Sequence, residues 1–383
     1  MNCYYNPVHT IQGPGCLAQL PDLVRSLPEN QRRVLLIVWS GDLLRHPVLA
    51  SLLEAEEEFK VQSLVFTPSN PTVEQLFQAW KDTSDFAPNL VVGVGGGTIL
   101  DVAKSLCCLY GTQLQNVDDL RARISEGTLK SAARWIGVPT TAGTGSEVTC
   151  WATIWDPEKD TKRSLESRDN YAWHALVDPE LAQGMPVRLA VSSALDAVAH
   201  AVESYWARHT NVVSRALALE AIRTIMGNID DLFSGSLSAH DAMAKGSMLA
   251  GLAFSNTKTT ACHSISYPLT MHYQIPHGTA AAILLAPVLA LNAPAVKDLE
   301  PLLEALGVKD ADMLQRRISG LLLRSAQAAS LEGWGVPSKE LPHLAALGIT
   351  KGRADNNPVP LTPDKIESLL ESVYKMNPVP CIH

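Results

Sequence analysis

The strands recognisable in this chain of 383 residues are confined to its first half, and helical periodicity dominates the second. The apolar runs 34–39, 61–66 and 89–94 show no alternation, which is typical of strands buried on both faces of a parallel sheet. Helical stretches separate these runs, and a further strand is predicted at 135–139. This alternation of strand and helix favours right-handed crossovers and a doubly wound α/β sheet.

No strand is predicted after Asp178. From Arg188 onward one helix follows another, at roughly 192–209, 212–231, 239–255, between 296 and 329, and at 362–374. The length accommodates two to three domains. We predict two, an α/β domain over residues 1–185 and an all-helical domain over residues 186–383, with the ligand in a cleft between them.

Composition and charge exclude several classes of protein. With 46% hydrophobic and 18% charged residues and no low-complexity tract, the chain resembles an ordinary globular protein. Its 31 basic and 39 acidic side chains give a net charge of −8, and no basic cluster is interleaved with aromatics, so nucleic acid is not an expected partner. Seven cysteines without a Cys-x-x-Cys motif indicate neither a disulfide framework nor a thiolate zinc site, and they fit a reducing cytoplasm.

Two stretches bear on targeting and membranes. Residues 1–7 lack a basic region followed by an apolar run, so no secretory signal is expected. The longest apolar run, 279–296, is interrupted by Pro287 and Pro294. We interpret it as a buried helix, too short and interrupted to span a bilayer, and expect no membrane partner.

A glycine-rich turn follows the third predicted strand. Gly95, Gly96 and Gly97 let the backbone approach a ligand, and the helix that opens near Thr98 directs free N–H groups at a phosphate. The spacing from Gly93 is not the full dinucleotide fingerprint, because Thr98 occupies the place of the last glycine. The turn therefore indicates a phosphate site, with a plain glycine turn as the alternative.

A second polar loop, 140–147, follows the strand at 135–139. Its four hydroxyl side chains and two glycines suit a pyrophosphate or a nicotinamide amide. A solvated Ser/Thr loop is the alternative interpretation.

Four residues could together hold one divalent metal ion. Asp196 and His200 are four apart in a predicted helix and therefore lie on one face. His263 and His277 would join them from later elements. One oxygen and three imidazole nitrogens suit Fe(II) or Zn(II) better than Mg or Ca. Since the chain has 11 histidines, ordinary core or surface roles are the alternative.

In combination these motifs resemble the iron-dependent (group III) alcohol dehydrogenases. The order and spacing agree over nearly the whole chain, for Gly13-Pro14-Gly15, residues 95–104, residues 139–147, Asp196-x-x-x-His200, His263, Pro276-His277-Gly278 and Asn357-Pro358. The resemblance implies an NAD(P)H-dependent oxidoreductase with a Rossmann-like N-terminal domain and a helical metal-binding domain. It implies Fe(II) as the metal, with Zn(II) as the alternative.

The resemblance also assigns roles to residues of this chain. It implies four metal ligands, namely Asp196, His200, His263 and His277. It implies contacts to the coenzyme pyrophosphate from Gly95, Gly96, Gly97, Thr98 and Asp101, and from the neighbouring loop by Thr140, Thr141 and Thr144.

Two positions depart from the family pattern. Tyr267 stands where many members have a second histidine. A phenol, with an unperturbed pKa of about 10, is a poorer proton shuttle than imidazole. Water, the ribose hydroxyls or nearby His272 could take that role, and the sequence does not decide among them. Ser40 stands where many members carry an aspartate on the adenosine ribose. Loss of that charge makes NADPH acceptable, so we expect NADPH to be used at least as well as NADH.

The segments 151–156 and 263–270 together with Lys258 are similar to the phosphonoacetaldehyde reductase branch of the family, which forms 2-hydroxyethylphosphonate. Lys258 is close in sequence to His263 and could hold an anionic substrate. Lys162, also assigned to the coenzyme, and Arg163 are further candidate cations. We expect interconversion of a short aldehyde and its primary alcohol, the aldehyde carrying a phosphonate or similar anion.

Two alternative functions are a zinc-dependent polyol dehydrogenase and a non-catalytic nucleotide-binding protein. A homodimer is compatible with the sequence, which is otherwise silent on oligomeric state.

Overall fold

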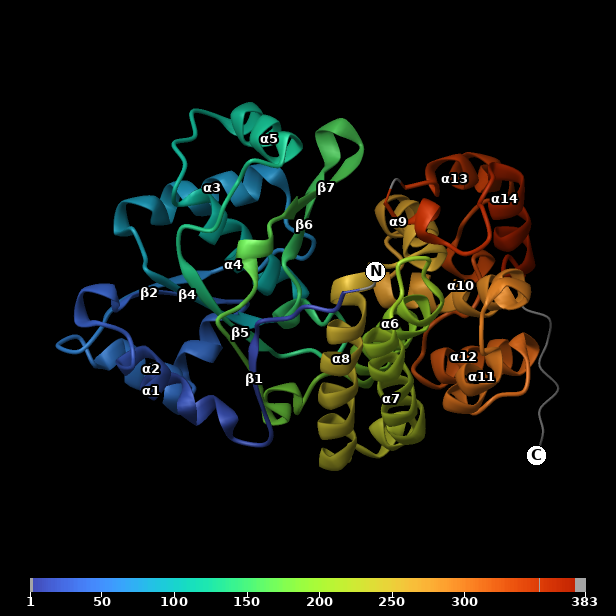
Figure 1. Cartoon of the computed structure of the whole chain (residues 1–383), viewed down its shortest axis with the longest axis horizontal. Helices are drawn as coiled ribbons and strands as arrows, with labels where there is room; N and C mark the ends of the chain where they lie inside the picture. Colours follow the sequence, from blue (N-terminus) through green and yellow to red (C-terminus); the bar gives the residue numbers. More distant parts are fainter. Residues whose placement is uncertain (1–2, 351, 376–383) are drawn as a thin grey trace. The chain divides into compact units, whose positions relative to one another are not determined.

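The computed structural model describes residues 3–350 and 352–375, and the chain divides into two compact units (Figure 1). The sheet unit comprises Asn6–Thr141 and Ser146–Ala182. The helical unit comprises Met1–Tyr5, Ala142–Gly145 and Gln183–His383. The segment Ala142–Gly145, which we predicted within the first domain, thus clusters with the helices.

The sheet unit is built on six parallel strands in the order β1-β8-β5-β4-β2-β3. Their bounds are β1 His9–Gln12, β2 Arg33–Val38, β3 Lys60–Val65, β4 Leu90–Gly95, β5 Arg134–Pro139 and β8 His174–Val177. Helices lie between these strands in the sequence, which confirms the predicted doubly wound α/β class.

The continuous apolar runs arise because the strands are covered on both faces. Alternate residues of β2 point to opposite cores, with Leu35 and Ile37 in one and Val34, Leu36 and Val38 in the other. The first core also takes α3 (Val73–Thr83), α4 (Gly97–Leu109) and α5 (Val117–Glu126), and the second takes α1 (Leu20–Arg25) and α2 (Pro47–Glu54). Each strand therefore needs apolar residues at every position.

One hairpin of the sheet unit was not predicted. The strands β6 (Trp151–Asp156) and β7 (Thr161–Glu166) pair antiparallel, apart from the main sheet. β7 is polar at most positions, with only Leu165 buried among its six residues, so it lacks an apolar signal.

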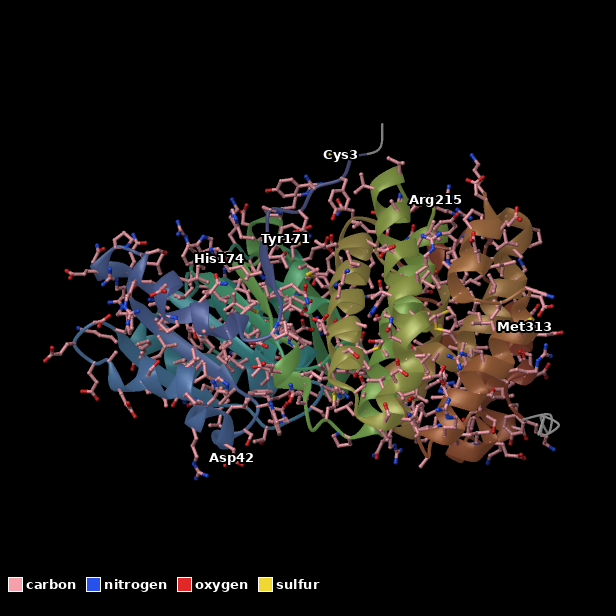
Figure 2. All side chains as sticks on the ribbon, turned by 90° about the horizontal axis from the view of Figure 1, so that it is seen from below. Cys3, Asp42, Tyr171, His174, Arg215 and Met313 are labelled. Carbon is pink, nitrogen blue, oxygen red and sulfur yellow. The ribbon has the colours of Figure 1, made fainter. Side chains whose placement is uncertain are left out.

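The helical unit has one core shared by all its long helices. Their bounds are α6 Val187–Trp206, α7 Val212–Asn228, α8 Leu237–Thr257, α9 Ala261–Tyr273, α10 His277–Asn292, α11 Leu299–Leu306, α12 Ala311–Arg324, α13 Leu341–Leu347 and α14 Pro363–Ser372. Figure 1 shows α6, α7 and α8 running side by side. Arg215 on α7, labelled in Figure 2, donates hydrogen bonds to Tyr205 of α6 (2.6 Å) and to Asp298 (3.0 Å).

Helix α10 contains most of the apolar run 279–296, which we predicted to be a buried helix. With the turn that follows, the helical segment His277–Ala295 has 19 residues and is long and apolar enough to cross a membrane by length and composition alone, so our prediction that it is too short was wrong. Pro287 lies inside the helix without ending it. Most of α10 is buried, and it packs against α6, α9 and α12. The prediction of a buried core helix is confirmed.

Candidate metal centre and coenzyme-binding turn

One face of α6 carries a series of ionisable groups. Asp196, His200 and Glu203 are spaced four and three residues apart, so they lie on one side of the helix. All three are at most 6% exposed. Burying three such groups on one helix face requires partners from other elements.

Asp196, His263 and His277 come together, with one potential ligand atom from each within 4.8 Å of the others. His263 lies in the first turn of α9, and His277 is the first residue of α10. Asp196 Oδ1 and His263 Nε2 are 3.3 Å apart, buried, and without a hydrogen-bond partner among the described residues. Buried polar atoms left in this way are costly unless something binds them, and this donor set fits Fe(II) or Zn(II).

The fourth predicted ligand, His200, lies beside this group without belonging to it. Its ring stacks on His263 at 4.2 Å and on Phe254 at 4.3 Å, and its Nδ1 is 4.0 Å from Asp196 Oδ2. Nδ1 also donates to the carbonyl oxygen of Gly143 at 3.2 Å. This hydrogen bond assigns the proton to Nδ1 and leaves Nε2 as the ring atom able to bind a metal.

The electrostatics of the cluster are those of a cation site. Burial acts to raise the pKa of Asp196, but the imidazoles, His200 first, hold that pKa below its usual value. Burial lowers the pKa of His200 to about 4. Burial also acts to lower the pKa of His263, but the charges and hydrogen bonds of Glu203 and Asp196 together outweigh it and raise the pKa to about 9. The buried carboxylates thus attract positive charge, which a divalent ion can supply in place of a proton.

Glu203 was missed by our sequence analysis. It is fully buried and accepts hydrogen bonds from His263 Nδ1, from Thr260 Oγ1 (2.8 Å) and from the Cys262 amide (2.6 Å). The feature of the sequence that could have identified Glu203 is its spacing, because a residue seven positions after Asp196 lies on the same helix face.

Glycines allow the chain segments of the centre to approach closely. A Cβ on Gly278, next to His277, would lie 2.2 Å from Ser192 O and 2.8 Å from Asp196 Cβ. A Cβ on Gly143 would lie 2.9 Å from Ser193 O, on the same helix. Only residues without a Cβ therefore let α10 and the segment 142–145 contact α6.

The predicted phosphate-binding turn forms as expected in the sheet unit. Gly95 ends β4 and Gly96 caps α4, where a Cβ on Gly95 would lie 2.4 Å from Ile99. Thr140 donates its amide to Gly95 O at 3.0 Å, and Thr141 Oγ1 would lie 3.2 Å from a Cβ on Gly96. The residues brought together here are Gly95, Gly96, Gly97, Thr98, Thr140 and Thr141, whereas Thr144 belongs to the helical unit.

Asp101 makes contacts of a different kind from those we predicted. Its carboxylate accepts hydrogen bonds from Ser146 Oγ (2.7 Å) and from the Thr153 amide (2.9 Å). The buried Lys104 ammonium donates to Ser146 and also to Thr149 (2.8 Å). These contacts fix the segment 146–153, and a carboxylate would in any case repel a pyrophosphate.

The four remaining polar candidates are not members of the metal group. Ser40 lies two residues after the end of β2 and accepts a hydrogen bond from the Asp42 amide at 3.2 Å. Lys162 is half-buried on β7 opposite Trp155. Lys258 is exposed in the turn after α8, at φ 61. Arg163 is paired with buried Asp156 at 2.6 Å, a contact that the sequence did not predict.

Tyr267 and His272, both on α9, have different surroundings. The Tyr267 ring stacks on the His277 ring, with centroids 5.8 Å apart and planes within 4°. The Arg353 guanidinium lies 5.0 Å from the centre of the Tyr267 ring, a contact our sequence analysis did not find. His272 is exposed in the last turn of α9, nine residues and therefore half a turn out of phase from His263. The geometry favours Tyr267 over His272 as the group beside the metal ligands.

Comparison with known proteins gives consistent matches along the chain. The family model "Iron-containing alcohol dehydrogenase" matches residues 7–179, and "Fe-containing alcohol dehydrogenase family, C-terminal" matches residues 190–374. The NADPH-dependent butanol dehydrogenase of Clostridium saccharobutylicum is 28% identical over 94% of this chain and 95% of that protein. The lactaldehyde reductase of Escherichia coli (strain K12) is 28% identical over 88% and 87%.

A solved structure supports the fold. The sulfoacetaldehyde reductase from Bifidobacterium kashiwanohense, in complex with NAD+, covers 98% of this chain and 100% of its own with a TM-score of 0.87. At 24% sequence identity, this likeness is evidence for the fold alone.

Proposed function

We propose, because this chain belongs to the iron-containing alcohol dehydrogenase family, that it reduces short aldehydes to primary alcohols and prefers aldehydes that carry an anionic group. Membership confirms the predicted class, an oxidoreductase enzyme that uses iron and a nicotinamide coenzyme. It rules out the non-catalytic nucleotide-binding alternative.

The observation that carries the proposal is the buried group of Asp196, His263 and His277, with His200 stacked beside it. We assign these four residues as the metal ligands. The metal, when bound, supplies Lewis acidity to an aldehyde carbonyl. The Tyr267 ring stacks on the His277 ring and so restrains the orientation of that ligand. This position beside a metal ligand supports a role for the Tyr267 hydroxyl as a hydrogen-bond donor to the substrate oxygen.

Coenzyme binding is assigned to the turn in the sheet unit. The amides at the start of α4 suit a pyrophosphate, since glycines at 95–97 leave the helix N-terminus open to a ligand. Ser40, which follows β2, carries no charge that would repel a 2′-phosphate. The NADPH dependence in the name of the butanol dehydrogenase relative supports NADPH as the coenzyme.

Arg353 supports an anionic substrate. Its guanidinium stacks over Tyr267, whose ring contacts His277, so one cation lies two ring contacts from the proposed metal centre. It is half-buried and forms no ion pair with a carboxylate of the described residues. A guanidinium so placed can bind a phosphonate or sulfonate in a bidentate manner. Lys258 stays a second candidate cation.

A reducing compartment such as the cytoplasm is also proposed. The six cysteines within the described part of the chain are all free, and five of them are buried. This usage is typical of proteins that do not rely on disulfides.

The experiment combines metal analysis with a coenzyme-oxidation assay. Anaerobically purified protein should retain iron, and should oxidise NADPH at least as fast as NADH with phosphonoacetaldehyde as substrate. His263→Ala should lose metal and lower kcat/KM by at least about a thousandfold, while NADPH binding measured by fluorescence persists. Unchanged metal content in this variant would contradict the assigned site.

The substrate preference is tested with Arg353→Gln. Loss of a charge-assisted contact should raise KM for phosphonoacetaldehyde about 10- to 100-fold and leave propanal turnover within about twofold. Arg163→Gln, which removes a paired arginine of the sheet unit, is the matched control and should leave both KM values unchanged. A wild-type preference for propanal over phosphonoacetaldehyde would refute the anionic class but not the metal centre.

A further inference from the structure

We propose that Glu203 is a positioning residue of the metal centre, which holds the ring of His263 in the orientation and tautomer that a metal ligand needs. The inference rests on the metal site assigned above and extends it to a residue with no place in the predicted ligand set. It is drawn from three hydrogen bonds that converge on one buried carboxylate.

The contact with His263 determines which ring nitrogen is available. A carboxylate can only accept, so the Nδ1 that faces Glu203 must carry the proton. In the neutral ring that binds a metal, Nε2 on the far side therefore carries the lone pair, and this atom lies 3.3 Å from Asp196 Oδ1. Without Glu203, the proton could reside on either nitrogen, and the tautomer protonated at Nε2 has no lone pair on that atom with which to bind the metal.

The same carboxylate fixes where α9 begins. The Cys262 amide, one of the donors left free at the helix start, donates to it at 2.6 Å, and Thr260 Oγ1 donates at 2.8 Å. The Thr260 hydroxyl in turn accepts from Trp206 Nε1 at 2.8 Å. Since Glu203 belongs to α6, it joins the helix of Asp196 to the first turn of α9, where His263 lies.

The chemistry of the site requires a carboxylate rather than an amide. Three donors converge on Glu203, and its two oxygens accept all of them. A glutamine offers one accepting oxygen and an NH2 group that must face a donor. In one orientation it opposes His263 Nδ1, and in the other it opposes Cys262 N and Thr260 Oγ1. Either orientation disturbs the ligand ring or the helix start.

Glu203→Gln tests this role by metal affinity rather than by activity. Zinc and cobalt(II) affinities are measured by competition with a chelator, and the cobalt site is followed by its visible absorption. The variant should bind both metals about 10- to 100-fold more weakly, the usual effect of removing a group that orients a histidine ligand. Circular dichroism of the metal-free protein and NADPH affinity should match wild type.

Trp206→Phe is the matched control. It removes the outer hydrogen bond to Thr260 and leaves the contact between Glu203 and His263 in place. Its metal affinity should stay within about twofold of wild type. If Trp206→Phe and Glu203→Gln weaken metal binding equally, Glu203 acts only as part of the local packing, and the inference is overturned.

A measurement on wild-type protein is independent of whether any variant folds. Long-range proton–nitrogen NMR of the zinc-loaded protein, with His263 assigned by the His263→Gln variant, should show Nδ1 protonated and Nε2 bound to zinc. The opposite tautomer would overturn the inference while leaving the metal site intact. If wild-type protein binds metal but His263→Gln binds it equally well, the proposed function fails as well.

Discussion

At the scale of single residues, several ionisable groups are buried outside the metal centre. Glu147, at the end of the 140–147 loop, is 2% exposed, and burial raises its pKa to about 7. Lys104 is fully buried, and burial lowers its pKa. Charged forms of both are disfavoured by the same lack of solvent. The sheet unit therefore contains a carboxyl group whose protonation is linked to stability near neutral pH.

We predict that Glu147→Gln becomes increasingly stabilising relative to wild type as the pH rises. The pKa of Glu147 is raised from 4.5 to about 7 on folding, so the unfolded chain releases this proton first. Wild-type stability is thus fully present below the unfolded pKa and is lost as the pH rises through the folded one. Between pH 5 and pH 8 the variant should gain about 1–3 kcal/mol relative to wild type in denaturant unfolding of metal-free protein.

Glu54→Gln, which removes one exposed carboxyl from α2, is the control for loss of a negative charge. A stability difference between Glu147→Gln and wild type that stays constant from pH 5 to pH 8 would contradict a protonated Glu147 in the folded state.

At the scale of elements, the centre depends on how closely three segments approach α6. The start of α10 and the segment 142–145 contact α6 through glycines, and Gly145, at φ 57, lies where a Cβ would be 2.5 Å from Gly251 of α8. The first turn of α9 is joined to α6 by Glu203. The ligand set is therefore assembled by helix packing, and its geometry should change when that packing changes.

Gly278→Ala should weaken metal binding although it replaces none of the proposed ligand residues. The new methyl would overlap Ser192 O at 2.2 Å, so α10 must move away from α6 and carry His277 with it. We expect metal affinity to fall at least tenfold and stability to fall by about 1–3 kcal/mol. Both are measured by chelator competition and by thermal unfolding with and without zinc.

Gly320→Ala is the matched control, because a Cβ at this position of α12 meets nothing within 4 Å. It should be neutral, or stabilising by up to about 1 kcal/mol, with unchanged metal affinity. Equal metal affinities of Gly278→Ala and Gly320→Ala would disprove the requirement for close approach.

At the scale of the whole molecule, the described cores segregate by unit. Two cores cover the two faces of the sheet, and a third is shared by the helices of the other unit. The proposed metal ligands all belong to the helical unit, and the glycine turn belongs to the sheet unit. Each ligand should therefore stabilise a different part of the molecule.

We expect calorimetry to resolve this separation. Zinc at about 100 times its dissociation constant should add about 2.7 kcal/mol to the unfolding free energy of the helical unit, and NADPH should do the same for the sheet unit. Amide hydrogen exchange identifies the protected segments, α6 and α9 with zinc, and β4 and α4 with NADPH. Protection of β4 by zinc alone would contradict the assignment of the two sites.

The sequence by itself determined the fold class and one face of the metal centre. Uninterrupted apolar runs predicted the parallel sheet because both faces of such strands are buried. The spacing of Asp196 and His200 placed them on one helix face, since the helical repeat is a local property. The glycine turn after β4 was equally local, because its conformation follows from residues that are adjacent in the chain.

Only the tertiary structure decided which distant groups meet. Glu203 and His263 are 60 residues apart and pair because α6 packs against the start of α9, which no periodicity encodes. Arg163 is a candidate cation in the sequence, and only the structure pairs it with Asp156 across the hairpin. Side-chain partners of this kind depend on packing between elements, whereas strands, helices and turns are determined largely by short stretches of the chain.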